Sequence, residues 1–65
     1  MYFNMGNVII NLENIRTVRM KKQLLFINYI GVIDPIIINY DNQNNCMAWY
    51  DVLLKKLIFG VDNEI

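Results

Sequence analysis

The chain has 65 residues, 55% of them apolar, and a formal net charge of zero, which predicts one small domain covering residues 1–65. With no histidine and a single cysteine, Cys46, the sequence excludes a cysteine-cluster metal site, an internal disulfide and the commonest general base, and no cofactor is expected. No signal-peptide pattern or membrane-length apolar run is visible, so we expect no membrane association and a cytoplasmic location.

The first two elements are predicted to form a hairpin. Residues 2–5 are a short apolar run that stops at Gly6-Asn7, and residues 8–12 resume as an apolar strand. Gly-Asn is a residue pair that accepts the positive φ of a tight hairpin turn. The polar residues 11–14 then indicate a turn or a bulge.

Two longer strands follow. Residues 15–20 alternate so that Arg16, Val18 and Met20 share one side, while Arg19 lies with Ile15 and Thr17 on the other. After a polar turn at residues 21–23, residues 24–30 are apolar on both faces, which is typical of a strand covered on two sides or exposed to a partner.

The last strand and a helix complete the chain. Gly31 and Asp34-Pro35 separate residues 24–30 from a strand at 36–40, and residues 41–45 offer several helix N-caps. Residues 46–58 have helical periodicity, with an expected end at Gly60 and a frayed tail beyond it. The buried side of this helix is predicted to hold Cys46, Met47, Tyr50, Leu53, Leu54 and Leu57.

This order predicts an α+β fold, a small antiparallel β-meander of four to five strands packed against one C-terminal helix. A single helix can cover only one face of the sheet. Because the apolar content also exceeds what one small core holds, we expect an apolar surface for a protein partner, with a homodimer as the simplest case.

Catalysis has little support in the sequence. The chain has no serine, and Thr17 has no histidine to activate it. Cys46 lies on the apolar side of the predicted helix, which is typical of a buried structural cysteine. We therefore predict that the protein is not an enzyme.

Two candidate binding surfaces stand out. One is the basic hairpin formed by Arg16, Arg19, Lys21 and Lys22. It can contact nucleic acid or an acidic protein, or it can simply be a solvated edge that discourages aggregation. The zero net charge, and the placement of Arg16 and Arg19 on opposite sides of a regular strand, favour the readings without nucleic acid.

The other candidate surface is the margin of the helix. There the indole of Trp49 and the ammonium group of Lys56 are expected to meet a partner, because tryptophan is enriched at protein interfaces.

The segment Ile10-Asn11-Leu12-Glu13-Asn14-Ile15, after the Gly6-Asn7 turn, resembles an "INLxNI" segment of small uncharacterised bacterial and phage proteins. The same stretch resembles a strand of LytTR-type DNA-binding domains, although their preceding His-Arg-Ser run is absent. In size and composition the chain is also similar to phage-encoded inhibitors of host defence. The first resemblance implies no particular chemistry, and the similarity of class implies an inhibitor from a mobile element that covers a host nuclease or nucleoprotein. The alternative is a small nucleic-acid-binding module that uses the basic hairpin.

Overall fold

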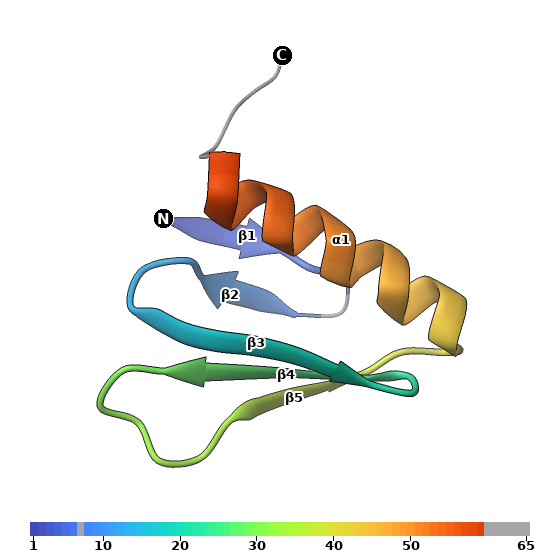
Figure 1. Ribbon diagram of the computed structural model, residues 1–65, viewed down its shortest axis with the longest axis horizontal. Coiled ribbons are helices and arrows are strands. Elements are labelled where there is room, and N and C mark those ends of the chain that lie inside the picture. The colour runs from blue at the N-terminus through green and yellow to red at the C-terminus, as the bar shows by residue number, and fades with distance from the viewer. Residues whose placement is uncertain (7, 60–65) are drawn as a thin grey trace.

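The computed structural model describes residues 1–6 and 8–59. Its elements in chain order are β1 (Tyr2–Asn4), β2 (Ile9–Asn11), β3 (Ile15–Lys21), β4 (Leu24–Tyr29), β5 (Ile36–Asn39) and α1 (Gln43–Phe59). The strands form two antiparallel sheets, β1–β2 and β3–β4–β5, and α1 lies along one side of them (Figure 1). The predicted α+β fold, an antiparallel meander against one C-terminal helix, is confirmed; its division into two sheets was not predicted.

The first hairpin closes as the sequence predicts. The Met5 N–H donates to the Val8 carbonyl oxygen at 2.8 Å, and the Gly6 N–H donates to the Asn4 side-chain oxygen at 2.9 Å. Gly6 has φ 98°, a left-handed conformation that a residue with a Cβ rarely adopts. A Cβ at Gly6 would also lie 3.4 Å from the Trp49 ring, so the turn and the helix are packed closely together.

Helix α1 begins earlier than predicted, and its cap explains why. The Asn42 side-chain oxygen accepts a hydrogen bond from the Asn45 N–H at 2.8 Å, and the Asn42 carbonyl accepts one from the Cys46 N–H at 3.1 Å. This is the geometry of an N-cap residue, so the helix starts at Gln43. The predicted helix end at Gly60 and the tail of residues 61–65 lie outside the described residues.

A buried apolar cluster joins α1 to both sheets. Its members are Met5, Ile10, Leu25, Ile27, Ile38, Tyr40, Cys46 and Leu53. The side of α1 that faces this cluster is rotated from the prediction toward Trp49, which packs against the cluster. The prediction that Met47 is buried is wrong, since its side chain is 49% exposed, and Leu57 is exposed as well. Trp49 packs inward in place of Met47 because its ring can contact the aromatic rings of Phe3 and Tyr40.

Two tyrosine hydroxyls connect the sheets. The Tyr40 hydroxyl donates to the Met5 carbonyl oxygen at 2.8 Å, and the Tyr29 hydroxyl donates to the Asn11 carbonyl oxygen at 2.6 Å. Met5 follows β1 at the turn end of the first hairpin, and Asn11 is the last residue of β2 at the other end, so the two bonds hold both ends of this hairpin to the β3–β4–β5 sheet. The two sheets are therefore fastened at their junction by side chains rather than by a shared ladder.

A β-bulge in β3 changes which of its side chains face the helix. Ile15 pairs with Tyr29 and Thr17 pairs with Asn28, so Arg16 is an extra residue in the ladder. Ile15, Val18 and Met20 are consequently all half-buried against the core. The prediction that Arg16 shares a side with Val18 and Met20, opposite Arg19, is wrong because it assumed a regular strand.

The buried hydroxyl of Tyr40 predicts a loss of stability at high pH. Burial, with a smaller contribution from the nearby Cys46, raises its pKa from 10.0 to about 12. The unfolded chain ionises this hydroxyl first, so the stabilisation is complete below pH 10.0 and is lost as the pH rises toward about 12. We expect Tyr40→Phe to lower the free energy of unfolding by about 1 kcal/mol at neutral pH and to flatten its decline at alkaline pH.

Urea denaturation at a series of pH values measures this effect. Tyr2→Phe is the matched control, because the Tyr2 side chain is 73% exposed, and it should behave as the wild type. An alkaline decline of the same size in Tyr40→Phe would show that another group causes it.

Candidate interaction surface

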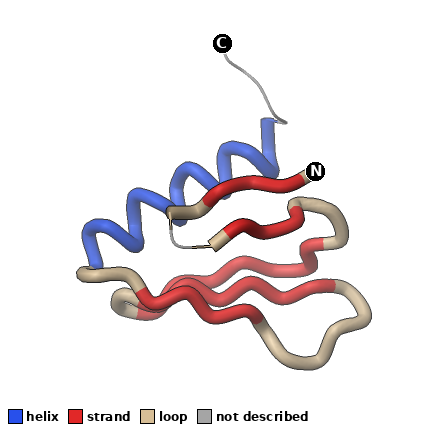
Figure 2. The backbone as a smooth tube through the Cα atoms, turned by 180° about the vertical axis from the view of Figure 1, so that it is seen from behind, coloured by secondary structure: helices blue, strands red, loops and turns tan. Residues whose placement is uncertain are grey.

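The β3–β4–β5 sheet has one face against α1 and one face open to solvent. The cluster residues Leu25, Ile27 and Ile38 point to the helix, so alternate residues point the other way. We call the second side the open face; its residues, from the strand registers, are Thr17, Arg19, Lys21, Leu24, Phe26, Asn28, Ile37 and Asn39. The single helix of the described chain lies on the opposite side (Figures 1 and 2).

The open face combines an apolar centre with a basic margin. One row across the sheet is Arg19, Phe26 and Ile37, in which Phe26 pairs with both neighbours. Phe26 is half-buried and Ile37 is 55% exposed. Arg19 and Lys21 lie on the edge strand β3 and are exposed, so positive charge flanks the apolar row along one side.

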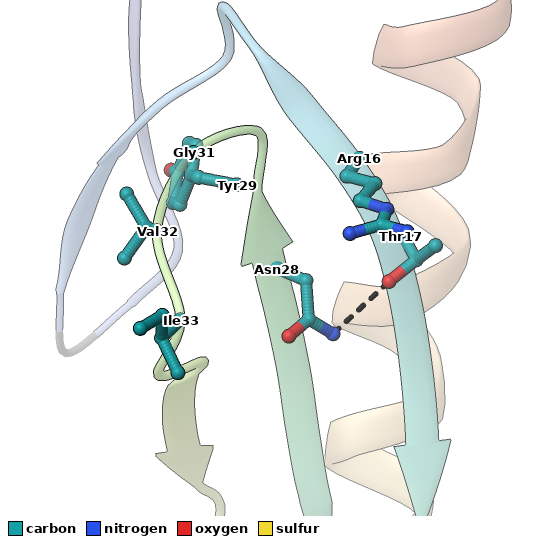
Figure 3. A pocket seen from close by; sticks show the side chains of 7 residues that line it. All are labelled: Arg16, Thr17, Asn28, Tyr29, Gly31, Val32 and Ile33. Atoms are coloured by element: carbon teal, nitrogen blue, oxygen red, sulfur yellow. Dashed lines mark hydrogen bonds between the residues drawn. The ribbon is translucent and has the colours of Figure 1, made fainter.

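The bulge adds Arg16 to this surface. Arg16 lines an open hollow of ≈ 630 Å³ together with Thr17 and Asn28 of the open face and with Tyr29 and the loop residues Gly31, Val32 and Ile33. Figure 3 shows the Arg16 guanidinium beside Thr17, with Val32 and Ile33 across the hollow. We call this site the Arg16 hollow. Arg16, Arg19 and Lys21 therefore form one basic column along β3.

The polar wall of the Arg16 hollow presents mainly hydrogen-bond donors. The Asn28 side-chain nitrogen donates to the Thr17 hydroxyl oxygen at 3.0 Å, which leaves the Thr17 O–H and the second Asn28 N–H available. Within the described part of the chain, no hydrogen bond or ion pair engages the Arg16 guanidinium, and no Asp or Glu lines the hollow. Such a wall suits an anionic group.

A second hollow lies at the other end of the open face. It has a volume of ≈ 460 Å³ and is lined by Arg19, Met20, Lys21 and Phe26. Lys22 stands outside both hollows, in the exposed turn that joins β3 to β4, with φ 57°. Of the four basic residues predicted as a site, three thus share one surface, and Lys22 lies next to it.

The loop between β4 and β5 carries unusually exposed apolar side chains. Ile33 is 93% exposed, Ile30 65% and Val32 55%. Asp34 follows Ile33 directly and is also exposed, and none of the ion pairs within the described residues includes it. In both views this loop extends beyond the strands, away from α1 (Figures 1 and 2).

Trp49 and Lys56 lie on the opposite side of the molecule from the open face. The Trp49 ring stacks on Tyr40, with ring centroids 6.3 Å apart and planes 13° apart. Its centroid is also 6.3 Å from that of the Phe3 ring, in an edge-to-face arrangement with the planes 63° apart. The Lys56 nitrogen sits 5.2 Å from the centre of the Phe3 ring, a cation–π contact. Both residues are half-buried, and both contact β1 from within the same chain.

Cys46, the one nucleophile candidate that the sequence offered on the helix, lies in the core. Cys46 is fully buried, and burial raises the pKa of its thiol, which disfavours the reactive thiolate. Among the described residues, no group of three histidine, cysteine or acidic side chains comes together as a metal site.

The sequence did not predict that Thr17, Asn28 and the β4–β5 loop form part of the candidate surface. One signal for the bulge was present: the apolar residues Ile15, Val18 and Met20 are spaced by three and then by two, so no single parity buries them all. An extra residue between Ile15 and Val18, as in a β-bulge, is needed to bring all three side chains to the same face of the sheet. The loop gave no such signal, because Ile30 reads as the end of a strand and Ile33 lies between the breaks at Gly31 and Asp34-Pro35.

The aromatic contacts of Trp49 predict a structural role that can be measured. We expect Trp49→Ala to lower the free energy of unfolding by about 3 kcal/mol, because it removes a ring packed on Tyr40 and Phe3. Met47→Ala is the control on the same helix, since Met47 is 49% exposed; its cost should stay below about 1 kcal/mol. Equal and small effects in the two variants, by chemical denaturation, would instead place Trp49 on the surface.

Comparison with known proteins finds no match, whether to a protein-family model, a curated protein or a solved structure. No helix in the described residues is both long and apolar enough to cross a membrane.

Proposed function

We propose that this chain is a non-enzymatic protein-binding module and that the open face of its β3–β4–β5 sheet is the binding surface. The observation that carries this proposal is the apolar row of Phe26 and Ile37, left uncovered beside the basic column of Arg16, Arg19 and Lys21. An apolar centre with a charged margin is the composition of a protein interface.

The basic margin favours a partner with an acidic surface. Burial of the apolar row supplies affinity, while the exposed cations act mainly on encounter rate and orientation. A second copy of the chain is the simplest partner, because the chain itself carries exposed acidic residues such as Asp34 and Asp41. In this form the protein is a homodimer.

The more specific form of the proposal is an inhibitor encoded by a phage or another mobile element. It would bind a host defence nuclease or nucleoprotein and block its surface. Its support is the similarity in size and composition to such inhibitors. The open face supplies a surface for this purpose.

A nucleic-acid-binding role is the second candidate, and the bulge favours it. Because Arg16, Arg19 and Lys21 lie along one face, they form a more continuous track for phosphates than a regular strand would. Phe26 in the same hollow as Arg19 and Lys21 offers a ring for base stacking. The balanced net charge and the apolar row favour the protein partner.

Photo-crosslinking in the native host separates the two candidates. A p-benzoylphenylalanine side chain replaces Ile37 on the open face, and the matched control carries it at Ile9, which is 65% exposed on β2 of the other sheet. We expect a discrete protein adduct from position 37 that resists nuclease treatment, and none from position 9.

Two results would contradict the proposal. Adducts that disappear on nuclease treatment assign the open face to nucleic acid. Equal labelling from positions 37 and 9, or no adduct from either, shows that the open face holds no specific partner.

A further inference from the structure

The β4–β5 loop and the Arg16 hollow are complementary to each other. The hollow presents the Arg16 guanidinium and a donor-rich polar wall, with Val32 and Ile33 as its apolar side. The loop carries Ile33 and Asp34, an exposed apolar side chain followed by an exposed carboxylate. Neither Arg16 nor Asp34 has an ion-pair partner within the described residues.

Because one chain carries both halves, two copies can satisfy each other. A two-fold interface brings the same patch of both subunits together, so that a contact from residue i to residue j is repeated from j to i. Ile33, which is 93% exposed, would lie at such an axis against its counterpart, and Val32 would be covered with it.

We propose that the Arg16 hollow is a docking site for a second copy of this chain. Asp34 of each copy pairs with Arg16 of the other, and the exposed Ile33 side chains meet between them. The planar guanidinium and the carboxylate form a bidentate pair, and the Thr17 hydroxyl is available as a further donor. This inference rests on the proposed protein-binding function and names its partner.

A carboxylate beside an apolar side chain fits the hollow better than a phosphate does. Among the described residues, Arg16 is the one cation that lines it, since Arg19 and Lys21 line the other hollow. The opposite wall is formed by Val32 and Ile33, which a phosphodiester backbone would leave in water. The same wall can be covered by the isoleucine that precedes Asp34 in the second copy.

Charge exchange tests the proposed pair, with sedimentation equilibrium of the purified chain as the measurement. We expect the wild type to form a dimer at micromolar concentrations. Arg16→Glu and Asp34→Arg should each weaken the dimer at least about tenfold, because each places like charges opposite one another. The double variant Arg16→Glu/Asp34→Arg restores the pair and should return to within about threefold of the wild type.

Lys22→Glu is the matched control. It makes the same charge change as Arg16→Glu on the same hairpin, but Lys22 lies outside the hollow, so its dimer constant should equal that of the wild type. The three substituted positions, Arg16, Lys22 and Asp34, are all exposed, so circular dichroism should show the wild-type fold in all four variants.

Failure of the double variant to recover shows that Arg16 and Asp34 do not pair across the dimer and overturns the inference. A wild-type dimer that none of the substitutions weakens overturns it too, while leaving the protein-binding proposal intact. A monomeric wild type overturns it, and protein adducts from position 37 then point to a different partner. A monomer whose binding to an oligonucleotide is lost in Arg16→Glu assigns the hollow to phosphate.

Discussion

The single helix of the described chain imposes the constraint on which the rest of the structure depends: it can cover one face of the β3–β4–β5 sheet and not the other. Leu25, Ile27 and Ile38 use the covered face, where Cys46 and Leu53 of α1 meet them. Phe26 and Ile37 are the alternate residues of the same strands and are left on the open side. A strand that is apolar on both faces thus satisfies the core and at the same time supplies a surface for a partner.

The bulge in β3 determines the character of that surface. Without it, burying Val18 and Met20 would carry the Arg16 guanidinium toward the core, where an unpaired charge is costly. The extra residue lets Ile15 join Val18 and Met20 on the inner side and turns Arg16 into the hollow beside Thr17. One irregularity therefore improves the packing and also aligns three cations. Bulges commonly redirect side chains in this way near functional surfaces.

Much of the fold follows from local patterns in the sequence. The first hairpin, the alternating strands and the asparagine-rich helix start are each specified by a few neighbouring residues, and each is present. The rotation of α1 was not predictable from its own periodicity, because Trp49 packs inward on Phe3 and Tyr40, which lie outside the helix. The same holds for the candidate site: the basic residues were visible in the sequence, but their common face depends on the register between β3 and β4. The loop's role depends on its position beside Arg16.

Solvent accessibility, residue by residue, tests the central claim most directly. A neutral paramagnetic co-solute broadens NMR signals of protons that water reaches, and it can be applied at a dilution where the chain is monomeric. We expect strong broadening of the Ile37 methyl groups, with protection of Leu25 and Ile27 on the covered face and intermediate protection of Ile15. If Ile37 is as well protected as Leu25 in the monomer, the face is not open. If Ile15 is as accessible as Ile37, the bulge does not turn Ile15 toward the core.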